Sequence, residues 1–599
     1  MKVAQYIAAR LVEHGIRQVF MVTGGGAMHL NHALGTHPEL NVVFNHHEQA
    51  SAMAAEAYFR LTNRLAVVNV TSGPGGTNAI TGVYGAWTDS IGMLVLSGQV
   101  KYETTVRASG LALRQFGDQE LDIERLIQPI TKYSAMVIDP TTIRYHIEKA
   151  LFIATAGRPG PVWLDIPLNV QAARIDPSKL VGFEPAEVDQ PWQNTNLSDA
   201  CNAILEKLTK AVRPVLFAGG GVRLSGSHAQ FLEVADKLGI PVVTGWNAHD
   251  VIYNGHTHYV GRPGTLGDRS GNFTVQNADL LLILGSRLNI RQVSYNWENF
   301  ARTAYKIWVD IDPLELQKTT VRADMPVVAH LGQLLPILAK ADYPGPTQAH
   351  SDWLAWCKER QRCFPVVLPE YWENKKVNPY CFIDRLFSHL LEDQIVVAAN
   401  GTACVVGFQA AIIKKGQRFF TNSGAASMGY DLPAAIGACM AAPHRTVVCL
   451  AGDGSIMMNL QELQTITSLG LPVKIFILNN SGYVSIFQTQ KNFFNGEEVG
   501  AGPNSGVILP DYKKISEAFN IPFQRCCNHE DLDKVIVQAF AVKGAAICEI
   551  MLDENQAFAP KLSSRQMPDG TMVSAPLEDM APFLERALLV ENMIIPIKD

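Results

Sequence analysis

The amino-acid sequence predicts an α/β protein made of three doubly wound domains, each with a parallel sheet between layers of helices. Two observations support this prediction. Short apolar strands recur along the chain, and each is followed by a glycine-rich turn and a helical segment, which is the rhythm of parallel sheets. The chain has 599 residues, more than one hydrophobic core usually serves, so we expect several domains of roughly 150 to 200 residues each.

The first domain is expected at residues 1–172. It opens with an amphipathic helix, because apolar Val3, Ile7 and Leu11 stand at helical spacing with charged residues between them, and this is not the pattern of a signal sequence. Its predicted strands are VFMVT (19–23), NVVFN (41–45), AVVNVT (66–71), MLVLSG (93–98) and PVWLDIP (161–167). A polar stretch at about 171–198 carries few strand or helix signals and is predicted to be a linker.

The second and third domains are expected at residues 195–340 and 353–555. Strands of the second are predicted in PVLFAGGG (214–221), IPVVTG (240–245), ADLLLILGSR (278–287) and KIWVDIDP (306–313). The Pro- and Gly-containing segment 341–352 is predicted to be a linker. Strands of the third are predicted in QIVVAAN (394–400), RTVVCLAGDG (445–454), VKIFILNN (473–480) and AAICEIML (545–552). Residues 556–599 are expected to form an irregular tail that covers a site.

Composition excludes several classes of function. The 50 basic and 56 acidic residues are spread along the chain without a Lys/Arg block, so we expect no binding to nucleic acid. No run approaches the ~20 apolar residues that a membrane span needs, so we expect no membrane insertion. The ten cysteines are scattered, which fits neither a disulfide framework nor a zinc site. We interpret them as buried thiols of a cytoplasmic protein.

The strongest chemical signal is Gly452-Asp453-Gly454-Ser455 at the end of one strand, followed by Asn479-Asn480 at the end of the next. Glycines let the backbone turn sharply and approach a ligand, and the helix expected to follow offers its positive N-terminus to a phosphate. An Asp and an Asn amide oxygen are hard ligands of the kind that Mg²⁺ prefers. A lone Gly-Asp-Gly is often an ordinary tight turn, but joined to the asparagine pair it predicts a site for magnesium and a diphosphate.

Gly-Asp-Gly followed by Asn-Asn is the signature of the thiamine-diphosphate enzymes, and the sequence resembles that family along its whole length. The resemblance implies that Asp453, Asn480 and the backbone carbonyl of Gly482 bind Mg²⁺, which in turn holds thiamine diphosphate. It also implies that the three domains are a pyrimidine-binding domain, a central domain of the nucleotide or FAD type, and a diphosphate-binding domain. Active sites in this family lie between subunits, so a homodimer or homotetramer is expected.

Glu48 stands at the predicted start of a helix in FNHHEQASAMAAEAY (44–58). A carboxylate there can simply favour the N-terminus of the helix. The resemblance implies a catalytic role, in which Glu48 hydrogen-bonds the aminopyrimidine ring of the cofactor and exchanges a proton with it. We expect burial to raise the pKa of such a carboxyl group, so that it can share a proton at neutral pH.

Other segments match the cofactor site of the family. Pro74 and Asn78 in TSGPGGTN (71–78) are expected near the pyrimidine ring. Met428 corresponds to the bulky apolar residue that holds the cofactor in its bent form, although a Met in an Ala-rich stretch is usually a core gap-filler. The other residues expected to bind the cofactor, most of them beside its diphosphate, are Asn400, Gly401, Thr402, Gly452, Asp453, Gly454, Ser455, Asn480, Gly482 and Tyr483.

Within the family, the sequence most resembles the large subunit of acetolactate synthase, through HEQ, TSGPGGTNAITG, LSGQV and DLPAAIGA. This implies decarboxylation of pyruvate and transfer of the acetyl unit to a carbonyl acceptor in a site near Gly25, Gln119 and Phe487. Asp118 stands where the family has an aromatic residue, and Phe487 where acetolactate synthases have a Trp.

These two departures leave other acceptors open. The alternatives are a specialised carboligase that acts on a keto-sugar nucleotide or a diketone, and a simple 2-keto-acid decarboxylase. Further from the main hypothesis are a non-catalytic cofactor-binding regulator and a flavin oxidase that uses O₂.

The central segment resembles the FAD-binding domain of acetolactate synthase. The residues that carry this resemblance are Gly220, Gly221, Arg287, Arg291 and Asp310. A glycine-rich turn alone is weak evidence for a dinucleotide, and LNIR (288–291) departs from the pattern of the family. On the resemblance we expect this domain to bind FAD, with another nucleotide or no ligand as the alternatives. The role of FAD would be structural, because decarboxylation and carboligation transfer no net electrons.

Overall fold

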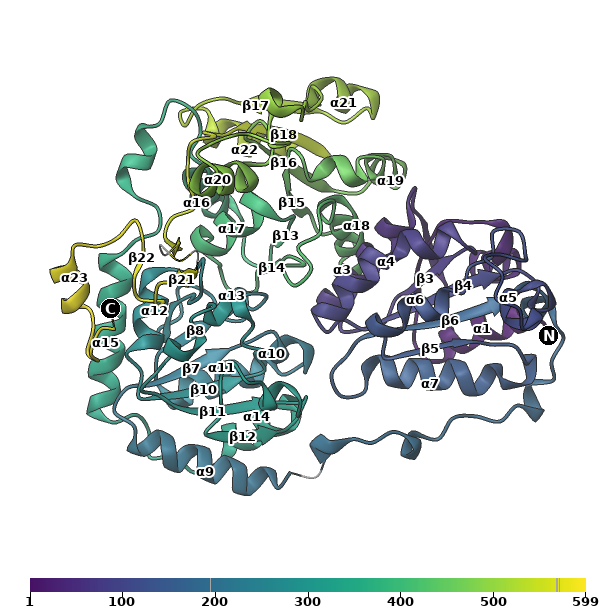
Figure 1. Cartoon of the computed structure of the whole chain (residues 1–599), viewed down its shortest axis with the longest axis horizontal. Helices are drawn as coiled ribbons and strands as arrows, with labels where there is room; N and C mark the ends of the chain where they lie inside the picture. The colour runs from purple at the N-terminus through teal and green to yellow at the C-terminus, as the bar shows by residue number, and fades with distance from the viewer. Residues whose placement is uncertain (194, 567–568, 570, 599) are drawn as a thin grey trace.

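Three six-stranded parallel sheets, each with helices packed around it, form the body of the molecule and confirm the predicted fold class (Figure 1). The computed structural model describes residues 1–193, 195–566, 569 and 571–598. None of the helices within these ranges is long and apolar enough to cross a membrane.

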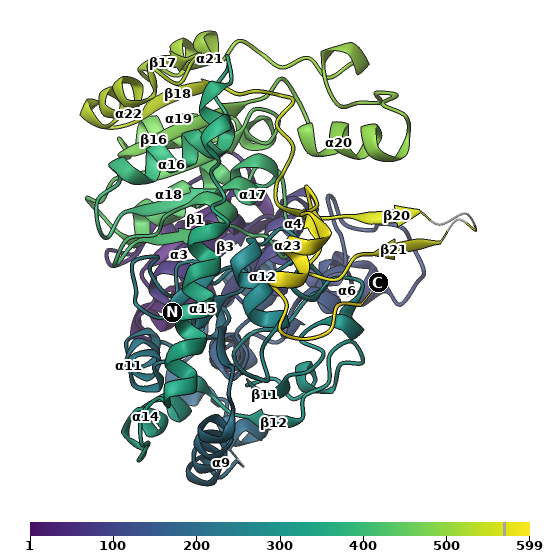
Figure 2. The same cartoon turned by 90° about the vertical axis from the view of Figure 1, so that its left-hand side faces the viewer.

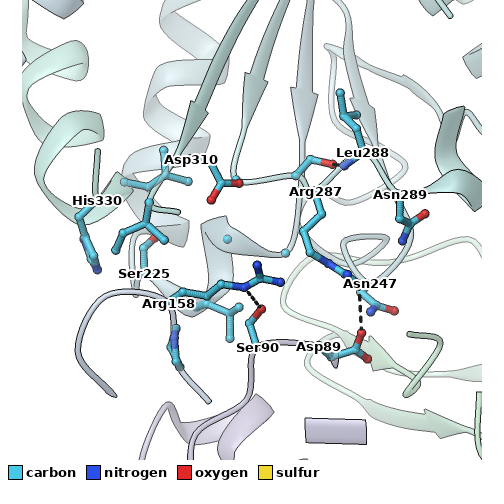
Figure 3. A pocket seen from close by; sticks show the side chains of 18 of the residues that line it. Asp89, Ser90, Arg158, Ser225, Asn247, Arg287, Leu288, Asn289, Asp310 and His330 are labelled. Atoms are coloured by element: carbon cyan, nitrogen blue, oxygen red, sulfur yellow. Dashed lines mark hydrogen bonds and ion pairs between the residues drawn. The ribbon is translucent and has the colours of Figure 1, made fainter. Parts of the chain in front are cut away.

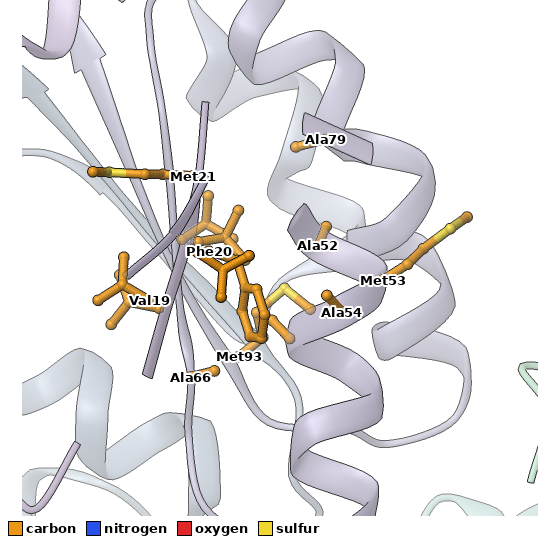
Figure 4. Packing of buried hydrophobic residues seen from close by; sticks show 14 of the residues in the cluster. Val19, Phe20, Met21, Ala52, Met53, Ala54, Ala66, Ala79 and Met93 are labelled. Carbon is orange, nitrogen blue, oxygen red and sulfur yellow. The ribbon is translucent and has the colours of Figure 1, made fainter. Parts of the chain in front are cut away.

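The sheet of the first domain has the strand order β2-β1-β3-β4-β6-β5. Its strands are β1 (Gln18–Met21), β2 (Asn41–Phe44), β3 (Val67–Val70), β4 (Met93–Gln99), β5 (Tyr133–Met136) and β6 (Pro161–Pro167). Its main helices are α1 (Val3–Glu13), α2 (Met28–Gly35), α3 (Glu48–Thr62), α4 (Pro74–Thr88), α6 (Ile123–Ile127) and α7 (Ile143–Thr155). Figure 4 shows Phe20 and Met93 packed under the alanine-rich face of α3. Small residues on this face let α4 approach so closely that a Cβ at Gly82 would contact Ala52.

The central sheet has the order β12-β11-β10-β7-β8-β9. Its strands are β7 (Pro214–Ala218), β8 (Val242–Thr244), β9 (Tyr259–Gly261), β10 (Leu280–Leu284), β11 (Tyr305–Asp310) and β12 (Met325–Val328). Its helices include α9 (Leu197–Lys210), α10 (Gly221–Leu224), α11 (His228–Leu238), α12 (Arg269–Gln276) and α14 (Leu331–Lys340).

Two segments that we expected to be linkers differ in structure. Between the first and second domains, short 3₁₀ turns interrupt an extended chain, which runs along the bottom of Figure 1. The segment 341–352 instead contains the start of α15 (Gln348–Cys363), which the Thr347 side chain caps. Trp353 and Cys357 of this helix belong to the core of the central domain. The long helix therefore packs on the central domain along its own length (Figure 2).

The third sheet has the order β14-β13-β15-β16-β18-β17. Its strands are β13 (Ile395–Ala398), β14 (Arg418–Phe420), β15 (Val447–Gly452), β16 (Val473–Asn479), β17 (Phe523–Cys526) and β18 (Ala546–Met551). Its helices are α16 (Pro379–His389), α17 (Gly401–Ala410), α18 (Asp431–Ala441), α19 (Glu462–Ser468), α20 (Val484–Phe493), α21 (Tyr512–Ala518) and α22 (Leu532–Ala541).

The strands that the sequence analysis missed are edge strands. They are β5, β9, β12, β14 and β17. The central strands are continuous apolar runs because both of their faces are buried, whereas most of the missed edge strands are short and partly exposed. A pattern search for buried strands therefore finds the middle of each sheet and misses all the edge strands except β2, which was predicted at 41–45.

The C-terminal tail is more regular than expected. It forms two antiparallel pairs and a helix, namely β19 (Lys561–Leu562) with β22 (Met580–Ala581), β20 (Ser564–Gln566) with β21 (Met572–Ser574), and α23 (Arg586–Glu591). Buried Glu578 joins the tail to the central domain, since it pairs with Arg302 at 2.8 Å and accepts a hydrogen bond from Gln276 at 2.6 Å. β20 and β21 project beyond the body (Figure 2). Coverage of a site by the tail stays a prediction.

The first and third domains are joined by the packing of α3 against α18 (Figure 1). The helices are so close that a Cβ at Gly437 would overlap the carbonyl of Ala54. Beside them, Glu462 accepts hydrogen bonds from the Asn45 side chain and the His46 backbone, both at 2.9 Å. This contact fixes the N-terminus of α3, and so Glu48, relative to the third domain.

Asp165→Asn is expected to remove part of the pH dependence of stability. Asp165 lies in the core of the first sheet, where it accepts hydrogen bonds from Ser97 and Gln99. Burial raises the pKa of Asp165 to about 7, above its value in the unfolded chain. The folded state therefore holds this proton more tightly, and the resulting stabilisation is complete below the unfolded-state pKa and is lost as pH rises through about 7.

The measurement is urea unfolding, followed by circular dichroism, at about pH 5 and about pH 8. The fall in the free energy of unfolding between the two pH values should be smaller in the variant than in the wild type, by on the order of a few kcal/mol. Asp199→Asn, on the exposed side of α9, serves as a control. An equal fall in all three proteins would contradict the role of Asp165.

Candidate functional site

The Gly-Asp-Gly turn and the asparagine pair meet at the carboxyl ends of two neighbouring strands. β15 and β16 are paired in parallel, with Gly452 opposite Leu478. Asp453 follows the first strand, and its Oδ2 accepts hydrogen bonds from the backbone N–H groups of Asn480 at 3.1 Å and Gly482 at 3.0 Å. The two motifs are therefore brought together as their spacing predicted.

Two side chains with oxygen ligand atoms are buried at this meeting point. Asn480 Oδ1 is buried and has no hydrogen-bond partner among the described residues, while Nδ2 of the same amide donates to Thr402 at 3.1 Å. Burial raises the pKa of Asp453 to about 6. A buried carboxylate and an orphaned amide oxygen are costly unless a ligand satisfies them, and together they fit a hard divalent cation.

The turn is held by side chains behind it. Ser455 Oγ donates to Asp431 Oδ2 and accepts from the Gly429 N–H, both at 2.9 Å, so its hydroxyl is used inside the protein. The Tyr512 hydroxyl donates to the backbone carbonyl of Asp453. Sequence reasoning missed Tyr512, which is distant in sequence and carries no motif. The motif DLPAAIGA begins at Asp431, but the sequence did not predict a role for this residue.

The other residues expected beside the diphosphate surround the same turn. Gly401 begins α17 with φ +59°, a conformation that favours glycine. Asn400 donates to the Ala426 carbonyl at 2.9 Å, next to the half-buried Met428. The Tyr483 ring lies so close to Gly454 that a Cβ there would overlap it. Gly482 has φ +138°, and a Cβ on it would overlap the carbonyl of Ala501.

Glu48 belongs to a second cluster, on the first domain. It is the first residue of α3, and the side chain of the preceding His47 caps the helix by accepting from the Gln49 N–H at 3.0 Å. Its Oε2 accepts a hydrogen bond from the Asn78 side chain at 3.0 Å. Pro74 is the first residue of α4, the helix that also carries Asn78. The predicted pyrimidine contacts are therefore neighbours in the structure.

The three residues predicted for the acceptor site lie on two different domains. Gly25 is exposed at the start of a 3₁₀ turn, and Gln119 is exposed with φ +59°. The Gln119 carbonyl packs against Gly73, in the loop before Pro74. Phe487 is half-buried on α20 of the third domain. Their role in acceptor binding stays a prediction.

A pocket lies between the first and central domains. Its lining includes Gly220, Gly221, Arg287 and Asp310, as the sequence predicted (Figure 3). Arg291 is not among the lining residues, and its guanidinium lies 5.8 Å from the centre of the Trp246 ring.

Sequence reasoning missed the part of the wall that the first domain supplies, namely Asp89, Ser90 and Arg158. Arg158 pairs with Asp312 at 3.0 Å and Glu315 at 2.8 Å, and its Nε donates to Ser90 at 2.7 Å. We call this cavity the interdomain pocket.

The chemistry of the interdomain pocket suits a ligand with phosphates and hydroxyls. Arg287 places a guanidinium in it, and Gly220 leaves room for close approach of a ligand, since the nearest atom to a Cβ there would be 3.6 Å away. Burial raises the pKa of Asp310, at the end of β11, to about 6. A carboxylate at the end of a strand in such a domain is well placed to accept from ribose hydroxyls.

Models of thiamine pyrophosphate enzymes match all three domains. The N-terminal TPP binding domain matches residues 1–126, the central domain residues 201–338, and the C-terminal TPP binding domain residues 399–550.

Full-length relatives agree with these matches. The acetolactate synthase isozyme 3 large subunit of Escherichia coli (strain K12) is 33% identical over 524 residues, which cover 86% of this chain and 88% of the relative. The acetolactate synthase large subunit of Pyropia yezoensis is 30% identical over 577 residues, 93% of each chain. That of Haemophilus influenzae is 29% identical over 595 residues, 96% of this chain and 99% of the relative.

Gly454→Ala is expected to destabilise the turn, because the added methyl group overlaps the Tyr483 ring. Overpacking of this kind costs about 1–3 kcal/mol. Gly452→Ala is the matched control, since the nearest atom to its Cβ would be 3.6 Å away. Urea unfolding of both variants measures the difference, and equal free energies of unfolding would contradict the close packing described here.

Proposed function

The chain belongs to the thiamine pyrophosphate enzymes, and from this premise we propose that it decarboxylates pyruvate and transfers the acetyl unit to a carbonyl acceptor. The observation that carries the proposal is the buried pair of Asp453 and Asn480, whose free amide oxygen lies in the domain that matches the TPP binding model. The acetolactate synthase relatives support a second pyruvate as the acceptor, with acetolactate as the product, over a keto-sugar nucleotide or a diketone.

We assign the Asp453 carboxylate, Asn480 Oδ1 and the Gly482 carbonyl to Mg²⁺. The donor set is all oxygen, and a divalent cation would satisfy the unpaired Asn480 Oδ1 and add a positive charge beside the buried Asp453 carboxylate. Thiamine diphosphate, when bound, supplies a carbon nucleophile and an electron sink for decarboxylation. Around its diphosphate we place Asn400, Gly401, Thr402, Gly452, Gly454 and the backbone of Ser455, with Met428 and Tyr483 beside the rest of the cofactor.

Glu48 is proposed as the residue that exchanges a proton with the aminopyrimidine ring. Its carboxylate is nearly buried, and Asn78 fixes one oxygen by a hydrogen bond of 3.0 Å, which leaves Oε1 to face a ligand. A positioned carboxyl group is an effective proton donor and acceptor when its geometry is fixed in this way.

The proposed site is shared between two copies of the chain. Glu48, Pro74 and Asn78 lie on the first domain and the Asp453 turn on the third, and active sites between subunits are the arrangement that the family resemblance implies. We therefore propose a homodimer as the minimum and a homotetramer as the larger assembly. Gly25 and Gln119 from one copy and Phe487 from the other would then border the acceptor. The exposed Asp118 adds a negative charge beside Gln119.

We propose that the interdomain pocket binds FAD in a structural role. Arg287, Asp310 and the turn at Gly220 and Gly221 line this pocket and support a nucleotide, and cofactor sites are often found between domains, as here. The protein is proposed to be cytoplasmic, which its ten free thiols support.

Product identification tests the proposed reaction. Purified protein is incubated with thiamine diphosphate, Mg²⁺ and isotopically labelled pyruvate, and the products are identified by mass spectrometry. We expect labelled CO₂ and acetolactate, and in Glu48→Gln a rate lower by about 10²–10⁴-fold, because the proton exchange is lost. Glu39→Gln is the control, since Glu39 is exposed and pairs only with Arg17 on the surface. No CO₂ from pyruvate would refute the proposal.

Asn480→Ala is expected to weaken Mg²⁺ binding by about 10-fold or more, because it removes one oxygen ligand. Binding is measured by calorimetry at a fixed concentration of thiamine diphosphate. Asn479→Ala is the matched control, because the Asn479 amide hydrogen-bonds within the protein. It donates to Glu549 and accepts from the Ser481 N–H. Equal Mg²⁺ affinity in the Asn480 variant and the wild type would remove Asn480 from the proposed site.

A further inference from the structure

A row of charged side chains runs from the interdomain pocket into the contact between the first and third domains. Asp89 Oδ1 lies 3.8 Å from Arg287 Nη2 at the pocket wall (Figure 3). Asp89 Oδ2 pairs with Arg60 Nη2 at 2.6 Å. Arg60 Nε in turn donates to Glu56 Oε1 at 3.0 Å. We call Asp89, Arg60 and Glu56 the buried ion chain.

The buried ion chain is unbalanced in charge. Its side chains are 1%, 7% and 0% exposed for Asp89, Arg60 and Glu56, so water does not screen them. Two carboxylates share one guanidinium, which leaves a net negative charge when both are ionised. The further cation beside Asp89 is Arg287, whose side chain is 32% exposed in the pocket. Movement or neutralisation of Arg287 therefore changes the electrostatic energy of Asp89, Arg60 and Glu56 together.

The pocket end of the buried ion chain is open to a ligand. Asp89 lines the pocket, and its Oδ1 is buried without a hydrogen-bond partner in the described part of the chain. A ligand phosphate can attract Arg287, which is exposed in the pocket, away from this buried oxygen. Loss of the Arg287 charge beside it acts on Asp89 directly.

The other end of the buried ion chain reaches residues 424–431, a segment of the third domain that contacts the Asp453 turn. Glu56 lies beside the buried Tyr430 hydroxyl, and burial raises the pKa of Glu56 to about 7. Tyr430 immediately precedes Asp431, which accepts from Ser455. The same third-domain segment packs directly on Asp89, since a Cβ at Gly424 would overlap Asp89 Oδ1. Residues 424–431 are thus held between the buried ion chain and the Asp453 turn.

We propose that the buried ion chain couples binding of a nucleotide in the interdomain pocket to binding of thiamine diphosphate in the third domain. Asp89 is the residue that senses the ligand, and Arg60 and Glu56 are positioning residues that act through Tyr430 and the 424–431 segment. The inference rests on the proposed function, because it takes thiamine diphosphate as the cofactor of the third domain. The pocket ligand is a nucleotide that carries both phosphates and hydroxyls.

The coupling is measured on the full chain with FAD as the probe. The Kd of thiamine diphosphate is determined at fixed Mg²⁺ with and without saturating FAD, in the wild type and in Asp89→Asn. We expect FAD to lower this Kd by about 5-fold or more in the wild type, and thiamine diphosphate to lower the Kd of FAD by the same factor. In Asp89→Asn, which keeps the shape and removes the charge, both factors should fall to near one.

Asp312→Asn is the matched control for this experiment. It removes a carboxylate that pairs with Arg158 at the edge of the same pocket but does not belong to the buried ion chain. Its affinity for FAD can change, while its coupling factor should equal that of the wild type. Absence of coupling in the wild type, or equal coupling in Asp89→Asn, would overturn the inference.

A second measurement needs no FAD. Arg60→Lys and Glu56→Gln should raise the Kd of thiamine diphosphate by about 10-fold, while the KM of pyruvate at saturating cofactor stays within about 2-fold. Circular dichroism shows whether the variants fold. If Arg60→Lys does not fold, Glu56→Gln still tests the inference, because glutamine has nearly the same volume as glutamate. An unchanged Kd in a folded variant would also overturn the inference.

Failure of this inference and failure of the proposed function give different results. A wild-type protein that forms acetolactate but shows no coupling refutes the inference alone. One that shows coupling but releases no CO₂ from pyruvate refutes the proposed reaction alone.

Discussion

The buried oxygen atoms at the ends of β15 and β16 are the constraint on which the rest of the site depends. A carboxylate and an amide oxygen removed from water are unfavourable unless a cation satisfies them. The surrounding structure keeps them in place at this cost. Tyr512 holds the Asp453 carbonyl, Ser455 joins the turn to Asp431, and two backbone N–H groups fix the carboxylate. The Mg²⁺ that we propose at this place would satisfy the unpaired amide oxygen of Asn480.

The contact between α3 and α18 holds the first and third domains of one chain on one rigid frame. Alanines on both helices and Gly437 on α18 let the backbones approach closely, and the buried ion chain lies beside the same contact. Because packed cores shift between discrete arrangements more readily than they deform continuously, a small change at Asp89 has a defined path toward residues 424–431. The interdomain pocket and the Asp453 turn therefore share mechanical support, although they lie on different domains.

The sequence predicted the parts of this structure that local patterns encode. Central strands such as β10 and β16 are continuous apolar runs, and the motif around Asp453 stands at the end of one of them. Edge strands such as β5 and β12 were missed because partial exposure breaks the apolar pattern. Tyr512 and Asp89 could not be predicted either. Tyr512 meets Asp453, and Asp89 meets Arg287, only after the chain has folded, and no spacing rule connects residues so far apart in sequence.

The docking of the C-terminal tail has a consequence for the order in which the chain matures during translation. Leu577 belongs to the core of the central domain, Glu578 pairs with Arg302, and Asn277 donates to the Asn592 carbonyl. The ribosome makes the strands of the central domain well before these residues. The middle of the protein must therefore wait, with part of its apolar interior uncovered, until the third domain and the tail have emerged. The domain in the centre of the sequence is the last to be completed, and a nascent chain is exposed to aggregation or to chaperone binding at that place.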